Sequence, residues 1–240
     1  MDTALGVLVV LTAYFIKGLS GFGPALVMVP FLSLLFDPTT AISVTALMDF
    51  LAGGFLLPSV RKTVQWKLVL QIFAALALGA VLGTYLLGMI PLQILKKIIG
   101  ITILVFTVLI LLQRENNLPL NKAAGGSFWR YPVGFLSGLL GGLLGISGPP
   151  LIIYMKLRYP KTFFRSQLIG IFFLGTGWRF FLYQINRIGL NLTPVDLGVF
   201  IVVMIAGVFA GHRVQIRMSE RLFNRIVALL ISIPAVRLLF

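Results

Sequence analysis

Long apolar runs that carry almost no charge fill most of this 240-residue chain. Three of them, in the first half, lie at about 40–58, 67–88 and 92–112. Each is close to the roughly 20 residues that a helix needs to cross the hydrocarbon core of a bilayer. With hydrophobic residues at 59% and charged residues at 11%, a chain of this length could not bury its apolar side chains in a soluble core. The sequence therefore predicts an all-α polytopic membrane protein.

Two further apolar runs are interrupted by clusters of glycine and proline. The first cluster covers residues 17–24 and lies between apolar pieces at 4–16 and 24–36, each too short to span comfortably. The second cluster covers residues 141–150 in the other half of the chain. Glycine weakens a helix and proline removes a backbone donor, so we expect a broken or re-entrant helical hairpin at each cluster. In membrane transporters, paired interruptions of this kind point to the binding site.

The second half of the chain repeats the landmarks of the first half in the same order. This predicts a first membrane repeat at 1–112, a polar connector at 113–130 and a second membrane repeat at 131–240. The matching pairs are Gly18 and Gly142, Gly21 and Gly145, Pro24 and Pro149, Pro38 and Pro160, Gly79 and Gly207, and Gly83 and Gly211.

Basic residues in the loops predict how the chain is oriented. If each interrupted segment is a hairpin that returns to its own side, each half contains one hairpin and three crossings. The whole chain then has about eight hydrophobic units. Fourteen loop Lys and Arg residues then face one side, against four on the other, namely Lys96, Lys97, Arg187 and Arg237. If each segment crosses once, the division is nearly even. The positive-inside rule favours the hairpins. The two repeats are then inverted relative to each other, and both termini lie on the outer side of the cytoplasmic (inner) membrane.

The two clusters have the chemistry of an anion site. Pro24 and Pro149 suit the start of a returning helix, whose free N–H groups and positive dipole end would face the substrate. Glycines let the backbone approach a ligand, and the serines offer hydroxyl groups. The predicted substrate-binding residues of the clusters are Lys17, Ser20, Gly21, Phe22, Gly23, Pro24, Gly145, Ile146, Ser147, Gly148 and Pro149.

Three polar residues within apolar spans extend this prediction. Arg179 could hold an anion, with snorkelling to the interface as the alternative. Asp49 and Gln167 are predicted to serve either in coupling or as structural polar partners. Lys17 also has a snorkelling alternative, and Gly18 has a packing alternative.

Several classes of function are disfavoured by the sequence. The net charge of +14 is spread over short loops between apolar spans, so we expect no nucleic-acid binding. Cysteine is absent and His212 is the one histidine, so we expect neither a metal nor another cofactor. An intramembrane enzyme would need acids in its spans together with a nucleophile or a metal site, but Glu115 and Glu220 both fall in predicted loops and leave Asp49 as the one carboxylate well inside a span. We therefore predict that the chain is not an enzyme.

The motif at residues 17–27, with Pro30 and with its echo at 142–151, resembles the TauE/SafE sulfite exporter family. The resemblance covers nearly the whole chain. It implies a transporter of small sulfur-containing anions such as sulfite or organosulfonates, with the lipid bilayer and a small anionic substrate as its partners. The second motif departs from the family pattern because two prolines, Pro149 and Pro150, follow Gly148.

Some alternatives stay open at the level of sequence. Basic residues and helix N-termini would also serve an anion channel. A transporter of a non-sulfur organic anion, or a membrane subunit that only scaffolds partners, fits the same pattern. Assembly into a homo-oligomer is open as well.

Overall fold

The computed structural model describes residues 2–20, 23–112, 127–214 and 220–239, and within these ranges the chain forms helices and no strands. The predicted all-α class is confirmed. The elements in chain order are α1 (Asp2–Ser20), α2 (Pro24–Leu35), α3 (Pro38–Val60), α4 (Trp66–Leu87), α5 (Leu92–Leu112), the 3-10 turn η1 (Ser127–Trp129), α6 (Arg130–Leu144), α7 (Gly148–Arg158), α8 (Lys161–Ile185), α9 (Pro194–Val214) and α10 (Glu220–Arg237).

Five of the described helices, α3, α4, α5, α8 and α9, are long and apolar enough to cross a bilayer. The spans predicted near 40–58, 67–88 and 92–112 correspond to α3, α4 and α5. Shorter apolar helices occupy Ala4–Leu19, Pro24–Leu35 and Val227–Arg237. The polytopic membrane class predicted from composition is thereby confirmed.

Local sequence accounts for where two of the long helices begin. Asp37 precedes α3 and accepts a hydrogen bond from the Thr40 backbone N–H at 2.9 Å. Thr193 precedes α9, and its hydroxyl oxygen accepts from the Asp196 N–H at 3.2 Å and donates to the Asp196 carboxylate at 2.8 Å. Both residues satisfy N–H groups of a first helical turn, which have no partner within the helix. Each side chain therefore fixes the start of a membrane span.

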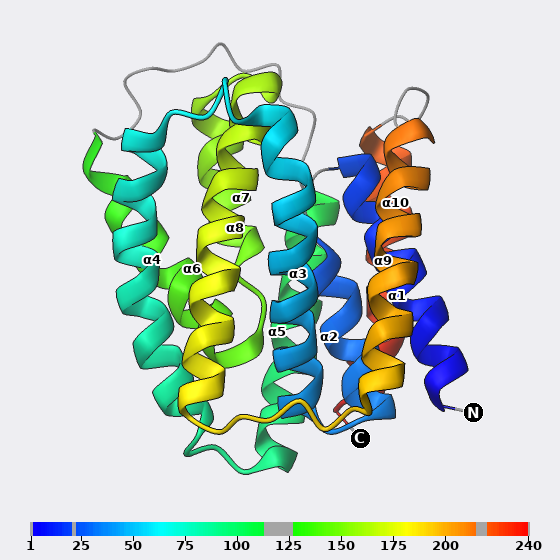
Figure 1. Cartoon of the computed structure of the whole chain (residues 1–240). Helices are drawn as coiled ribbons and strands as arrows, with labels where there is room; N and C mark the ends of the chain where they lie inside the picture. Colours follow the sequence, from blue (N-terminus) through cyan, green and yellow to red (C-terminus); the bar gives the residue numbers. More distant parts are fainter. Residues whose placement is uncertain (1, 21–22, 113–126, 215–219, 240) are drawn as a thin grey trace. The chain divides into compact units, whose positions relative to one another are not determined.

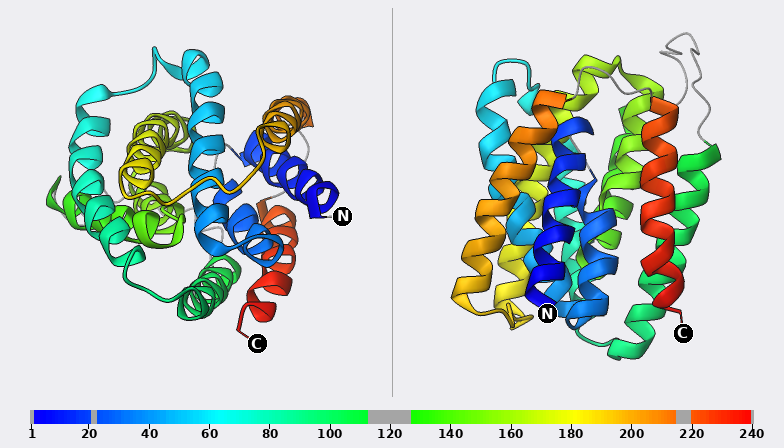
Figure 2. Two further views of the ribbon diagram at one scale, coloured as in Figure 1. Left: turned by 60° about the horizontal axis from the view of Figure 1, so that its bottom comes forward. Right: turned by 90° about the vertical axis from the view of Figure 1, so that its right-hand side faces the viewer.

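The described chain divides into two compact units, each of which draws on both predicted repeats. Unit 1 comprises residues 1–45, 90–117 and 189–240, and so holds α1, α2, α5, α9 and α10 with the start of α3. In this unit α1 lies beside α9, as Figure 1 and both views of Figure 2 show. α5 packs against α10 in the same unit.

Glycines bring α1 and α9 of unit 1 into backbone contact. A Cβ atom at Gly211 would lie 2.2 Å from the Phe15 carbonyl oxygen, and one at Gly18 would lie 2.5 Å from the Val208 carbonyl oxygen. Near the start of α1, Gly6 faces Phe200. Because contacts advance along both helices in the same direction, α1 and α9 are parallel. No larger side chain fits at either seam glycine, which supports the packing interpretation of Gly18.

Unit 2 comprises residues 46–89 and 118–188, and so holds the rest of α3 together with α4, η1, α6, α7 and α8. Its tightest seam joins α4 and α6, which also run parallel. A Cβ atom at Gly79 would lie 2.1 Å from the Phe135 carbonyl oxygen, and one at Gly138 would lie 1.9 Å from the Leu76 carbonyl oxygen. Small residues four positions apart let membrane helices approach in this way.

The two glycine seams use counterpart residues of the predicted repeats. Gly79 and Gly83 of α4 meet α6, whereas Gly207 and Gly211 of α9 meet α1. In both seams, therefore, the first helix of one repeat packs against the fourth helix of the other repeat. This agreement supports the duplication; the inversion of the second repeat and its sequence boundaries stay predictions.

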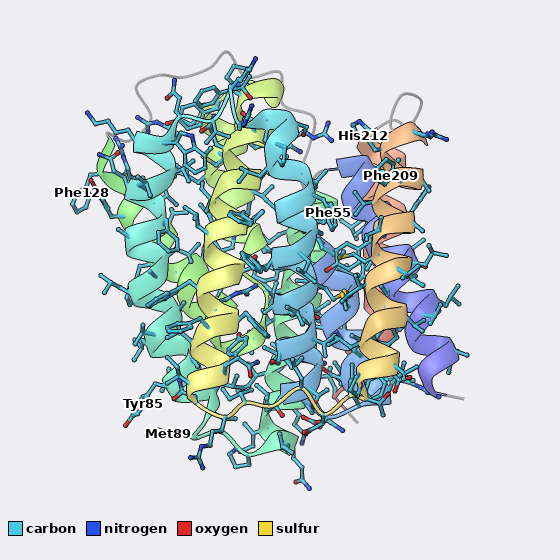
Figure 3. All side chains as sticks on the ribbon, viewed as in Figure 1. Phe55, Tyr85, Met89, Phe128, Phe209 and His212 are labelled. Carbon is cyan, nitrogen blue, oxygen red and sulfur yellow. The ribbon has the colours of Figure 1, made fainter. Side chains whose placement is uncertain are left out.

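Large apolar side chains remain exposed on the surface of each unit. In unit 2, Phe128 is 73% exposed, Met89 61% and Tyr85 58%. Figure 3 shows these side chains pointing away from the helices, with Phe128 near the start of α6 and the other two near the end of α4. Large apolar side chains are also exposed along all five helices that are long enough to cross a bilayer. A lipid environment accounts for this exposure.

Candidate functional site

The first helix break lies in unit 1, between Ser20 at the end of α1 and Pro24 at the start of α2. Gly21, Phe22 and the side chain of Ser20 lie outside the described residues. Gly23 precedes α2 with φ +94, and its carbonyl oxygen accepts a hydrogen bond from the Leu26 N–H at 3.1 Å. A Cβ atom there would meet nothing within 4 Å. Glycine is therefore suited to this position by its backbone conformation rather than by lack of space.

Lys17 lies in the last turn of α1, one turn before the break. Its side chain is 5% exposed, and its Nζ lies 5.6 Å from the ring centroid of Tyr14, which is fully buried. A cation at this distance is attracted to the face of an aromatic ring, and a positive charge also suits the C-terminal end of a helix. This burial disfavours the snorkelling alternative for Lys17 and leaves its proposed role in anion binding untested.

The second break lies in unit 2, between α6 and α7. Gly145 ends α6 with φ +74, and its N–H donates to the Gly141 carbonyl oxygen at 2.9 Å. Ile146 is fully buried, and Ser147 is 8% exposed and directly precedes α7. The chain therefore turns inside the protein, at a left-handed glycine that suits this helix end.

The prolines that follow Ser147 determine what its hydroxyl group can bind. A serine before a helix normally accepts a hydrogen bond from the N–H of the second or third helical residue. Here those residues are Pro149 and Pro150, which have no N–H, and Ser147 makes no capping bond. The hydroxyl group and the N–H groups of Ser147 and Gly148 are thus the polar donors that this turn offers to a ligand.

Arg179 and Tyr183, one turn apart on α8, fasten that helix to the end of α6. Arg179 Nη1 donates to the Gly141 carbonyl oxygen at 3.0 Å. The Tyr183 hydroxyl lies 2.9 Å from the same oxygen and 3.0 Å from the Gly142 carbonyl oxygen. These carbonyls belong to the last turn of α6, where carbonyl groups lack the full set of helix partners; the Gly141 oxygen also accepts from the Gly145 N–H. Both side chains therefore complete the C-terminal end of α6.

The guanidinium group of Arg179 is buried and keeps one donor without a partner among the described residues. The residue is 1% exposed, and Nε has no partner among the described residues. A Cβ atom at Gly141 would lie 2.9 Å from both Arg179 Nη1 and Ser147 Cβ, so the guanidinium and the serine pack against the same bare Cα atom. The sequence of unit 2 contains one carboxylate, Asp49. The second break thus carries a buried positive charge beside unused donors.

Asp49 and Gln167 differ in how much the structure says of their roles. Asp49 is 7% exposed on α3, and its role in coupling stays a prediction. Gln167 is fully buried on α8; its Nε2 donates to the Thr63 carbonyl oxygen at 3.0 Å, and its Oε1 accepts from the Gln65 N–H at 2.8 Å. Its amide therefore holds the connection between α3 and α4, which favours the structural alternative.

The site residues predicted from sequence fall in two units. Lys17, Gly23 and Pro24 belong to unit 1, whereas residues 145–149 and Arg179 belong to unit 2. Within unit 2, Arg179 and Ser147 come together around Gly141. The convergence of both breaks on a single site stays a prediction.

Tyr183 was not identified from the sequence. Its position four residues after Arg179 in an apolar span was the available signal, since residues at this spacing share a helix face. Spacing alone does not indicate that this face meets the end of α6.

The family model described as "Sulfite exporter TauE/SafE" matches residues 6–238. No curated protein and no solved structure matches the chain.

Proposed function

The chain belongs to the TauE/SafE sulfite exporter family, and from that premise we propose that it carries a small sulfur-containing oxyanion across the cytoplasmic membrane by alternating access. The family description names sulfite, and the proposal includes organosulfonates as anions of similar chemistry. The proposed site includes the α6–α7 break, with Arg179 as its positive charge. The α1–α2 break, with Lys17, is proposed to form the other part.

The observation that carries this proposal is the burial of Arg179 beside the break. Removing a guanidinium group from water costs several kcal/mol unless an opposite charge and hydrogen bonds compensate. The C-terminal end of α6 supplies a partial negative charge of about half an elementary charge. A bound anion would supply the remainder, and it would also meet the hydroxyl group of Ser147 and the N–H of Gly148.

The direction of the helices supports the inverted arrangement that alternating access requires. With the predicted hairpin wiring, successive helices reverse direction, so the first and fourth helices of one repeat are antiparallel. α1 is parallel to α9, which is the fourth helix of the second repeat, and α6 is parallel to α4. A second repeat in the same orientation as the first would instead make these pairs antiparallel. Inversion is therefore the arrangement consistent with both seams.

Flux into liposomes tests the proposal. Purified protein is reconstituted and offered sulfite, thiosulfate, methanesulfonate, sulfate and acetate in separate experiments. We expect saturable uptake of one or more sulfur oxyanions, accelerated by the same anion on the opposite side, as a carrier requires. Unitary currents in a planar bilayer would instead favour the channel. Absence of flux for every sulfur anion, with acetate transported, would reject the proposed substrate class.

A further inference from the structure

The way Arg179 is anchored binds one nitrogen of its guanidinium group and leaves another, Nε, without a partner among the described residues. The group carries five N–H donors in a fixed plane. Nη1 is bound to the Gly141 carbonyl oxygen, whereas Nε is buried and has no partner in the part of the chain that the structure describes. Nε and Nη2 form the side edge of the plane, where two N–H bonds point in nearly the same direction. This edge matches two oxygen atoms of a single acceptor group.

We propose that the Nε–Nη2 edge of Arg179 binds two oxygen atoms of the transported anion, so that the site selects oxyanions over single-atom anions such as chloride. This inference rests on the proposed function and adds the geometry by which the substrate is recognised. Two parallel hydrogen bonds require two oxygens on one central atom, as in sulfite or a sulfonate. A halide is a single acceptor atom, so the two parallel N–H bonds can reach it only at bent, less favourable angles.

The residues around Arg179 hold that edge in place. The Tyr183 hydroxyl and Arg179 Nη1 both donate to the Gly141 carbonyl oxygen, so two side chains one turn apart on α8 bind the same backbone atom. Residue 141 must also be small, because a Cβ atom there would lie 2.9 Å from Nη1 and 3.2 Å from Arg179 Cδ. Tyr183 is thus a positioning residue: it orients the guanidinium through Gly141 and contacts no substrate in this scheme.

The chemistry of the neighbouring turn agrees with an oxyanion. Ser147 lies against the same Cα atom as Arg179, and the prolines after it leave its hydroxyl group without a capping partner. A third substrate oxygen could accept a hydrogen bond from this hydroxyl group. No aspartate or glutamate other than Asp49 occurs in the sequence of unit 2, so few carboxylates compete for the guanidinium.

Equilibrium binding of three anions to the purified protein in detergent tests the proposal. Sulfite, methanesulfonate and chloride are titrated against the wild type and Arg179→Lys, which keeps the charge but loses the two-pronged edge. We expect sulfite and methanesulfonate affinity to fall about tenfold to a hundredfold, the equivalent of one charge-assisted hydrogen bond. Chloride affinity should change far less, so the ratio of sulfite to chloride affinity collapses.

The outcomes separate this inference from the function on which it rests. If the wild type binds no sulfur oxyanion, the proposed function fails and the inference fails with it. If the wild type binds sulfite and Arg179→Lys keeps the same sulfite-to-chloride ratio, the inference is overturned and the proposed function stands. Should Arg179→Lys fail to fold, Tyr183→Phe takes its place. A lower ratio of sulfite to chloride affinity in Tyr183→Phe supports recognition by the Nε–Nη2 edge, and an unchanged ratio contradicts it.

Discussion

Glycine is required at residue 145 because of its backbone conformation. Its φ of +74 ends α6 and directs the chain into the second break. A side chain in the left-handed region costs about 1 to 2 kcal/mol, so Gly145→Ala should lower the free energy of unfolding by about that amount. Thermal unfolding in detergent measures the change.

Gly148→Ala is the matched control for that substitution. Its added Cβ would meet only the Ile152 side-chain end at 3.3 Å and the Phe172 ring at 4.0 Å. Equal stability losses in the two variants would argue against a conformational requirement at Gly145.

Asp37 makes the stability of unit 1 depend on pH. Burial acts to raise the pKa of Asp37, but hydrogen bonds from Thr39, Thr40 and Asn191 outweigh it and hold the pKa below its usual value of 3.8. Because the folded protein favours the charged form, this stabilisation is present above the pKa of the unfolded chain and is lost as pH falls through the folded pKa. Asp37→Asn should therefore reduce the loss of the free energy of unfolding as the pH falls into the acid range. Thermal unfolding in detergent at a series of acid pH values measures this loss. If the variant lost stability with falling pH as steeply as the wild type, other groups would be responsible for the acid dependence.

Single residues were predicted from sequence where local chemistry decides their role. The helix breaks at the two glycine and proline clusters were predicted, and the structure places left-handed glycines in them at Gly23 and Gly145. Tyr183 was missed, because its contact with the end of α6 depends on how α8 packs. Gln167 was left between two roles for the same reason.

The seam between α4 and α6 is a property of paired helices rather than of either one alone. A Cβ atom at Gly138 would lie 1.9 Å from the Leu76 carbonyl oxygen, which is backbone and cannot rotate away. Gly138→Ala should therefore force the helices apart, at a cost of about 1 to 3 kcal/mol as in other overpacked interiors. Retention of the folded fraction after heating in detergent measures this loss.

Gly198 in α9 provides the opposite case. A Cβ atom there would meet nothing within 4 Å. Since alanine favours a helix over glycine by about 1 kcal/mol, Gly198→Ala should leave stability unchanged or raise it slightly. If Gly138→Ala were equally harmless, the close approach of α4 and α6 would be contradicted.

Helix positions were largely predictable, whereas helix partners were not. Apolar run length located α3, α4 and α5 to within a few residues. The first helix extends beyond the expected 4–16 and includes Lys17 and Gly18, because α9 packs against the bare surface of Gly18. The four-residue spacing of Gly79 and Gly83 is typical of a close helix contact, but it does not indicate that α6, from the other half of the chain, makes this contact.

At the scale of the whole molecule, each packing unit needs helices from both halves of the sequence. α1 packs on α9 in unit 1, and α4 packs on α6 in unit 2. Neither half alone can complete a glycine seam. If the chain is divided between residues 120 and 121, we expect the two fragments to co-purify when produced together and to be degraded when produced separately. A tag on one fragment and immunodetection of the other measure this.

The uncut chain carrying the same tag is the control for that experiment. Two fragments that each purify alone as monodisperse, heat-resistant species would show that the halves, and not the interleaved units, are the folding bodies. The sequence indicated the duplication. It could not indicate that each unit combines helices from both halves, because that arrangement depends on contacts between the halves.

The central claim is that the buried charge of Arg179 binds the transported anion. Exchange of labelled for unlabelled sulfite across reconstituted liposomes tests it most directly, with Arg179→Gln compared with Arg213→Gln, which removes an exposed arginine. With equal amounts of folded protein, the account predicts at least about a tenfold loss of exchange in Arg179→Gln, as expected for a lost charge-assisted bond, and wild-type exchange in Arg213→Gln. Wild-type exchange in Arg179→Gln would contradict it.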